Sequence, residues 1–143
     1  MISTPRPHTV GAPGYRQELP CAPESAVRAR RLIKAALCTW TLSRLAEDGT
    51  VVVSELVGNA VRHTRGKPLV VSIVRVGAAQ VRIAVSDRST AEPVERTPHD
   101  EDTDGRGLLV VAALADRWGT ERRRDGKVVW ADLSPGPGRG ALS

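Results

Sequence analysis

Residues 54–63 have the sequence Ser-Glu-Leu-Val-Gly-Asn-Ala-Val-Arg-His, and this stretch decides the fold. Apolar residues recur through it at helical spacing, so we expect a helix from about Thr50 to His63 with one face in a core. Glu55, Asn59 and His63 follow one another at intervals of four, which places them along one polar stripe of the same helix. The expected apolar stripe consists of Val53, Leu56, Val57 and Ala60.

The polar stripe indicates a chemical role, because a buried carboxylate or carboxamide destabilises the fold unless it finds a partner. Two oxygen-bearing side chains four residues apart suit a hydrated magnesium ion, which prefers hard oxygen ligands and keeps its waters. On spacing alone, Glu55 and Asn59 could equally face solvent on a half-exposed helix. We interpret His63 as a helix-end histidine near the C-terminal dipole.

Asp87 is the second feature of interest, because it continues an apolar alternation. It follows Val81, Ile83 and Val85 in phase, at the end of an expected strand near 80–87. A carboxylate on that face needs a hydrogen-bond donor. An adenine amino group is one candidate, and a cap on the residue's own loop is the other.

Asp104-Gly-Arg-Gly-Leu108 is the third feature, directly before an expected helix that ends near Ala115. Glycines before a helix N-terminus let backbone amides and the helix dipole meet phosphate. By itself the pattern is also that of an ordinary loop, and no Gly-Lys-Ser/Thr follows to make a Walker motif.

The remaining elements predict an α/β protein with a two-layer sandwich architecture. Strands that arrive in hairpins predict a mixed, mostly antiparallel sheet with the helices packed on one face. The Asp125-Gly126 pair is a strong signal for a hairpin turn. The other expected elements are a strand at 15–19, a helix near 24–46 broken by Asp48-Gly-Thr50, strands near 69–76 and 80–87 joined by Gly77-Ala-Ala79, a polar loop at 88–104, and strands near 118–123 and 127–133.

The length of 143 residues predicts one domain. We expect this domain at 15–134, a disordered arm at 1–14 that is rich in proline and glycine, and a flexible tail at 135–143. No apolar run approaches the ~20 residues of a membrane helix. The N-terminus also lacks the apolar centre of a signal peptide, so we expect a cytoplasmic protein with no membrane contact.

The formal net charge of +5 comes almost entirely from arginine. The arginine clusters at 28–31 and 122–124 are not interleaved with aromatic residues. A protein that binds single-stranded nucleic acid needs such aromatic residues for base stacking. We therefore expect no direct nucleic-acid contact, although DNA binding stays a third hypothesis. The helix near 24–46 would supply a surface for an acidic partner or a homodimer, or present a solvated arginine face.

The three motifs occur in an order that resembles the histidine-kinase-like (Bergerat-fold, GHKL) ATPases, especially their anti-sigma-factor serine kinase branch. The resemblance covers about residues 15–133 and implies the Bergerat ATP-binding fold. The matching stretches are Ser54-Glu-Leu-Val-Gly-Asn-Ala-Val-Arg-His-Thr64, Val85-Ser-Asp87, Gly105-Arg-Gly-Leu-Leu109, Leu114-Ala-Asp-Arg-Trp-Gly119 and Gly126-Lys-Val-Val-Trp130.

The resemblance also implies ATP and Mg²⁺ as cofactors and a role for each site residue. Asn59 would hold the magnesium that bridges the phosphates, Glu55 would act as general base on a serine hydroxyl, and Asp87 would accept from the adenine amino group. The nucleotide-binding loop would comprise Gly105, Arg106, Gly107 and Leu108, and the acidic stretch at 92–104 would be its mobile lid. The implied partners are a sigma factor and an anti-anti-sigma protein whose serine is phosphorylated.

The sequence departs from the family pattern directly after Asp87. The family has glycines there in a DxGxG arrangement, whereas this chain has Asp87-Arg-Ser-Thr-Ala91. Glycine permits close backbone approach, so its absence favours an alternative: a non-catalytic partner-switching module with weak or lost ATP binding.

Overall fold

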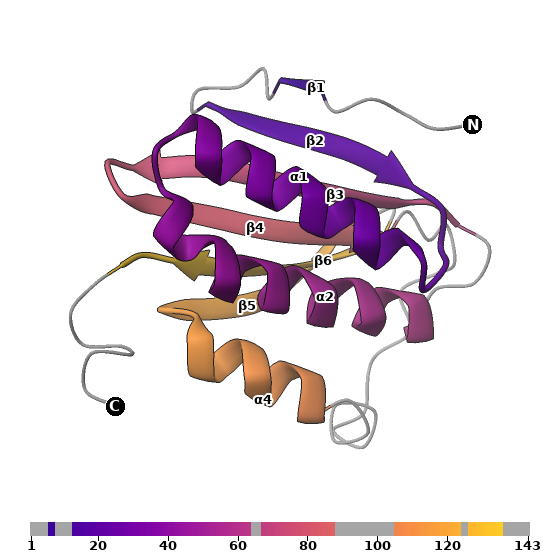
Figure 1. The fold of residues 1–143 in the computed structure, drawn as a ribbon. Helices are drawn as coiled ribbons and strands as arrows, with labels where there is room; N and C mark the ends of the chain where they lie inside the picture. The colour runs from indigo at the N-terminus through magenta and orange to yellow at the C-terminus, as the bar shows by residue number, and fades with distance from the viewer. Residues whose placement is uncertain (1–5, 8–12, 64–66, 88–104, 124–125, 136–143) are drawn as a thin grey trace.

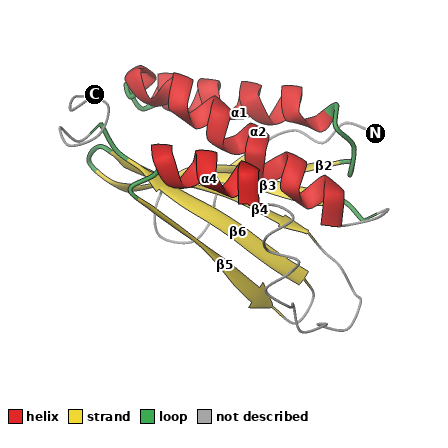
Figure 2. Cartoon of the chain, turned by 90° about the horizontal axis from the view of Figure 1, so that it is seen from below, coloured by secondary structure: helices red, strands yellow, loops and turns green. Residues whose placement is uncertain are grey.

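The structure, a computed structural model, describes residues 6–7, 13–63, 67–87, 105–123 and 126–135. Within these residues, six strands form one sheet in the order β1-β2-β3-β4-β6-β5, and every neighbouring pair is antiparallel. The helices cover one face of this sheet (Figures 1 and 2), which confirms the expected two-layer sandwich. The elements are β1 (Arg6–Pro7), β2 (Gly14–Leu19), α1 (Ser25–Thr39), the 3-10 helix η1 (Ser43–Leu45), α2 (Ala46–His63), β3 (Leu69–Gly77), β4 (Gln80–Asp87), α4 (Gly105–Leu114), β5 (Arg117–Arg123) and β6 (Gly126–Leu133).

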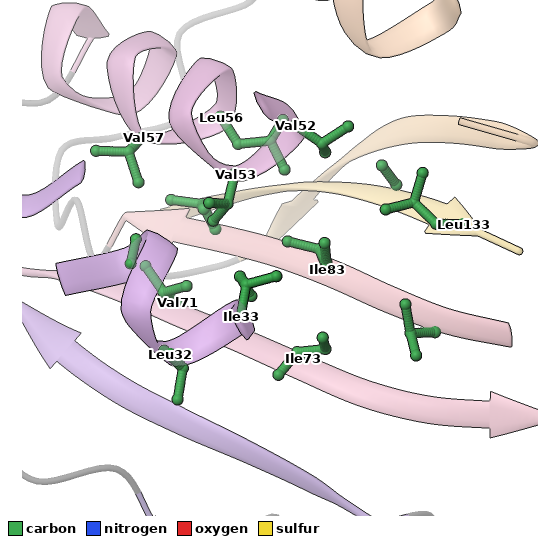
Figure 3. Close-up of a cluster of buried hydrophobic side chains, with 14 of the residues drawn as sticks. Leu32, Ile33, Val52, Val53, Leu56, Val57, Val71, Ile73, Ile83 and Leu133 are labelled. Atoms are coloured by element: carbon green, nitrogen blue, oxygen red, sulfur yellow. The ribbon is translucent and has the colours of Figure 1, made fainter. Parts of the chain in front are cut away.

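The core lies between the helices and the inner face of the sheet, and it is built from aliphatic side chains. Alternate residues of β3, β4 and β6 point to this face because side chains in a strand alternate between its two sides. The stripe expected on α2 is buried against them (Figure 3). Central members of the core are Ile33, Val52, Val53, Leu56, Val57, Val71, Ile73, Ile83 and Leu133.

The boundary between α1 and α2 differs from the sequence prediction. The first helix ends at Thr39, and Thr41 has a positive φ of 59°. The second helix runs without a break through Gly49, where a Cβ atom would lie 3.0 Å from Ile33 Cγ2. Gly49 is therefore a close-packing position between the two helices, and this tertiary contact overrides its low helix propensity.

Both expected hairpins are present. β3 and β4 are joined at Gly77–Gln80, and β5 and β6 at Arg123–Gly126. Gly126 is the first residue of β6, paired with Arg123, so its role differs from that of a turn residue alone. Val81, Ile83 and Val85 are buried on one face of β4, as their alternation predicted.

The expected disordered arm at 1–14 is corrected at three residues. Arg6 and Pro7 form β1, which pairs with Arg16 and Tyr15, and Gly14 already belongs to β2. Residues 1–5 and 8–12 of that segment, the expected lid at 92–104 and the tail beyond Pro135 lie outside the described residues. Among the helices that the structure describes, none combines the length and apolar character needed to cross a bilayer.

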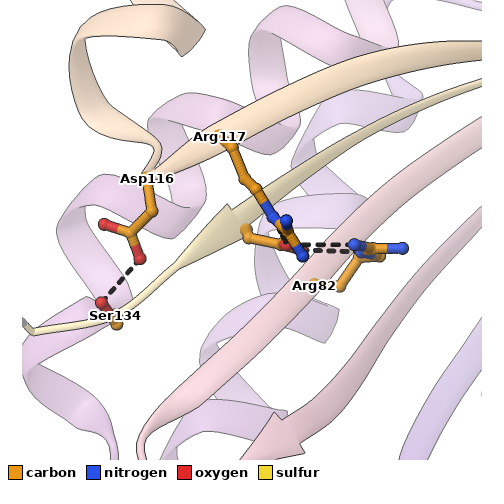
Figure 4. A network of polar contacts seen from close by, with 5 residues as sticks. Arg82, Asp116, Arg117 and Ser134 are labelled. Carbon is orange, nitrogen blue, oxygen red and sulfur yellow. Dashed lines mark hydrogen bonds and ion pairs between the residues drawn. The ribbon is translucent and has the colours of Figure 1, made fainter.

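The outer face of the sheet carries a compact ionic network around Asp132 on β6. The side chain of Asp132 is 1% exposed and accepts from Arg82 Nε at 2.7 Å, Arg82 Nη2 at 3.0 Å and Arg117 Nε at 3.0 Å (Figure 4). The guanidinium carbon of Arg82 also lies 4.1 Å from the centre of the Trp130 ring. Burial raises the pKa of Asp132, but hydrogen bonds and charge from the two arginines outweigh it and hold this pKa below its ordinary value.

Candidate nucleotide site

The C-terminal half of α2 places the predicted polar stripe at one edge of the buried helix face. Asn59 is 3% exposed, whereas Glu55 is half-buried and His63 is exposed at the helix end. The difference follows from helix geometry, because a stripe with a spacing of four drifts slowly around the helix: it crosses the buried face at Asn59 and has left that face at His63. The solvent-facing alternative is therefore wrong for Asn59.

Asn59 is unusual because its buried carboxamide makes no hydrogen bond within the part of the chain that the structure describes. A buried polar group without a partner costs about 1–3 kcal/mol. Other buried polar groups here are paired, such as Ser25, whose hydroxyl donates to the Pro20 carbonyl oxygen at 2.6 Å. A carboxamide oxygen in this position fits a hydrated magnesium ion, which would supply the missing interaction.

Glu55 lies beside a polar contact that ties α2 to α1. Arg30 Nη1 on α1 donates to Ser54 Oγ at 3.0 Å, and the Ser54 hydroxyl donates to the Thr50 carbonyl oxygen at 2.8 Å. These two bonds fix the turn of α2 that carries Glu55. The carboxylate of Glu55 therefore projects from a rigid helix rather than from a loop, at a half-buried position.

Asp87 is the last residue of β4 and lies on its buried face. It is 8% exposed, and its Oδ1 accepts from the backbone N–H of Lys127 at 3.3 Å. Asp87 pairs with Leu69 on one side and with Lys127 on the other, which makes it central in the sheet. The structure thus places this carboxylate where the sequence predicted, at the end of the core face.

The helix α4 begins at Gly105, earlier than expected, so Gly105, Arg106 and Gly107 form its first turn. Only their backbone is described. This helix packs against α2, and the half-buried Leu108 packs against the core. The helix N-terminus, where free N–H groups gather, therefore sits in the motif that the sequence singled out.

The fold brings these separate motifs to one end of the molecule. The second helix ends at His63, shortly before Leu69, and Leu69 pairs directly with Asp87. Figure 1 shows the end of α2, the end of β4, the start of α4 and the start of β6 at this same end. The site residues predicted from the sequence thus lie at one end of the molecule, although they come from three separate segments.

The sequence reasoning missed the contact between β6 and Asp87. Gly126 and Lys127 were expected only as a hairpin turn and as part of the closing motif. Their position opposite Asp87 depends on strand register, and the sequence signal for it is the matching apolar alternation of the two strands.

The comparison with protein families matches residues 19–133 to the histidine kinase-like ATPase domain. The chain belongs to this family. The match covers all the described site residues and the whole sheet from the end of β2 to β6. Family membership implies that the protein binds ATP, generally with Mg²⁺, and the orphaned carboxamide of Asn59 fits that implication. The search of curated proteins finds no match for this chain.

Proposed function

We propose that this histidine kinase-like ATPase domain is a cytoplasmic anti-sigma factor that phosphorylates a serine of an anti-anti-sigma partner. One observation carries the proposal: the carboxamide of Asn59 is buried, has no partner among the described residues, and lies one helical turn from the carboxylate of Glu55. The pairing of a magnesium-binding oxygen with a nearby reachable carboxylate is what phosphoryl transfer to a hydroxyl requires.

Each residue then has one task. Asn59 would hold the magnesium ion, and Asp87 would accept from the adenine amino group. When bound, ATP with Mg²⁺ supplies the phosphoryl group. Glu55 would accept the proton of the substrate serine hydroxyl while that oxygen bonds to phosphorus and ADP departs. The backbone N–H groups at the start of α4 would meet the phosphate charge.

The partner surface is proposed at the groove between α1 and β2. This groove, about 540 Å³ in volume, is lined by Tyr15, Gln17, Arg28, Arg31, Leu32, Ala35, Ala36 and Thr39. Every charged residue of α1 is basic, so the groove suits an acidic protein surface. Because the site motifs contribute no lining residue, partner binding and nucleotide binding can be separated by mutation.

The test is transfer of labelled phosphate from ATP to the anti-anti-sigma partner in the presence of Mg²⁺. We expect Glu55→Gln to lower the transfer rate about 10²- to 10⁴-fold, because removal of a general base typically costs that much. Glu47→Gln, at an exposed acid in the first turn of the same helix, is the matched control and should transfer at the normal rate. Equal rates for both variants would refute the catalytic assignment.

A second candidate function is a non-catalytic switch that sequesters its partner. The observation that favours it is the stretch Asp87-Arg-Ser-Thr-Ala91, which has no glycine after the adenine-binding aspartate. Calorimetry with ATP and Mg²⁺ separates the two functions. Binding at micromolar to millimolar nucleotide supports the kinase, whereas partner binding with no heat from millimolar ATP supports the switch.

A further inference from the structure

The start of β6 lies directly against Asp87, on the side of the strand opposite to β3. Lys127 is the cross-strand partner of Asp87, and its backbone N–H donates to Asp87 Oδ1 at 3.3 Å. A hydrogen bond from a rigid sheet backbone restricts rotation of the carboxylate, so one orientation of Asp87 is fixed before any ligand binds.

Gly126, the preceding residue, approaches Asp87 even more closely. A Cβ atom built on Gly126 would overlap the backbone oxygen of Asp87 and lie 2.9 Å from Asp87 Oδ1. Real Cβ atoms essentially never make contacts below 3.0 Å. The obstacle is backbone rather than a flexible side-chain end, so a larger residue at 126 requires Asp87 or the start of β6 to move.

Gly119 on β5 provides an internal comparison. A Cβ atom there would lie 2.8 Å from Cζ2 of Trp130, on the outer face of the neighbouring pair of strands, β5 and β6. The demand for glycine is weaker there than at Gly126, which faces the backbone of Asp87 at a φ of 156°. The neighbour of Gly119 is a ring that contacts the ionic network of Asp132 rather than a site residue. A comparison of substitutions at the two glycines therefore distinguishes a general effect on sheet packing from a specific effect on Asp87.

We propose that Gly126 is a positioning residue that, together with the Lys127 N–H, holds Asp87 in the orientation that selects adenine. This inference rests on the proposed ATP site and adds its base specificity. The exocyclic amino group of adenine donates to a carboxylate, whereas hypoxanthine has a carbonyl oxygen at the same position, which the carboxylate repels. A site built around one fixed hydrogen bond discriminates strongly against a base that lacks the donor.

The experiment compares the affinities of wild type, Gly126→Ala and Gly119→Ala for ATP, ITP and inorganic tripolyphosphate, each with Mg²⁺. Gly126→Ala should lose about tenfold or more in ATP affinity, the scale of one hydrogen bond to a charged group. Its affinities for ITP and tripolyphosphate should be nearly unchanged. Gly119→Ala should lower the melting temperature but retain the wild-type preference for ATP over ITP.

Two outcomes would overturn the proposal. One is an unchanged ratio of ATP to ITP affinity in Gly126→Ala. The other is an equal loss for ATP, ITP and tripolyphosphate, which would indicate a structural effect alone.

Asp87→Asn keeps the proposal testable if Gly126→Ala does not fold. The asparagine oxygen can still accept from the Lys127 N–H, while its NH₂ group presents a donor to the base. We expect the preference to shift from ATP toward ITP in this variant. A wild-type preference in folded Asp87→Asn would overturn the proposal.

A measurement without nucleotide separates this inference from the proposed function. The amide proton resonance of Lys127 should differ between wild type and Asp87→Ala, because the hydrogen bond to Asp87 Oδ1 is lost, and Gly126→Ala should also lose the wild-type resonance position. A Lys127 resonance at the same position in wild type and Asp87→Ala would overturn the positioning role even if ATP binds. Resonances that differ as expected, in a protein that binds none of the three ligands, would refute the ATP site and its adenine selection, while the orientation of Asp87 would stand.

Discussion

Asn59 on α2 and Asp132 on β6 are both buried polar residues, but they have opposite surroundings. Asp132 is 1% exposed and accepts three hydrogen bonds from two arginines. Asn59 is 3% exposed and has no hydrogen bond among the described residues. A fully paired buried group stabilises the fold, whereas an unpaired one destabilises it and indicates a ligand that completes it. The contrast separates a structural polar cluster of this protein from the site that we propose to be functional.

Between these two clusters, the largest expected effect is the loss of nucleotide binding in Asn59→Leu. This variant should lose about 10- to 100-fold in affinity for ATP with Mg²⁺, because a hydrogen bond or ligand contact involving charge is removed. Without nucleotide its free energy of unfolding should be unchanged or higher, since leucine has a similar size and no polar group. Calorimetry and urea unfolding measure the two quantities.

Gln17→Leu is the control for Asn59→Leu. Gln17 is also buried and polar, but it lies on β2 in the α1–β2 groove. We expect this variant to bind ATP normally. A nucleotide affinity in Asn59→Leu equal to that of Gln17→Leu would contradict the assignment of Asn59 as the magnesium-binding residue.

Asp132→Asn should show the reverse pattern, with a loss of stability and normal ATP affinity. We expect the free energy of unfolding to fall by about 1–2 kcal/mol, because charged hydrogen bonds are lost but both arginines are partly exposed. Urea unfolding measures the loss. If Asp132→Asn kept its stability but lost ATP affinity, the structural role of Asp132 would be contradicted.

Acidification should lower the stability of the fold through protonation of Asp132. Its pKa in the folded protein lies below the ordinary aspartate value, so its carboxylate contributes stability above about pH 4. That contribution is lost as the pH falls through the lowered folded pKa. The free energy of unfolding should therefore fall more in wild type than in Asp132→Asn when the pH is lowered from about 6 to about 3. Urea unfolding of both proteins at the two pH values measures the difference. Parallel pH profiles would exclude this role for Asp132.

The smallest expected effect is that of Trp130→Leu on the outer face. Removal of the ring takes away a cation–π contact with Arg82, which contributes about 0.5–1 kcal/mol at a partly exposed site. The melting temperature should fall slightly, and ATP affinity should stay at the wild-type value. A change in ATP affinity would mean that the outer face and the nucleotide site are coupled.

The sequence by itself determined most of the elements and the places of most candidate site residues within them. Alternation in β4 predicted the buried position of Asp87, and the spacing of four along α2 predicted the stripe with Asn59, because both depend on local backbone geometry. The resemblance to the family then supplied the roles that we propose for these residues. Local patterns were sufficient wherever one element decided which way its own side chains point.

Only the tertiary structure decided what lies between elements. Gly49 looked like a helix end, but its lack of a side chain permits α1 and α2 to pack closely. Gly126 looked like a turn residue, but strand register places it against the backbone of Asp87. The sequence could not separate Asn59 from Asp132 either, because whether a buried polar group finds a partner depends on side chains that arrive from distant strands and helices.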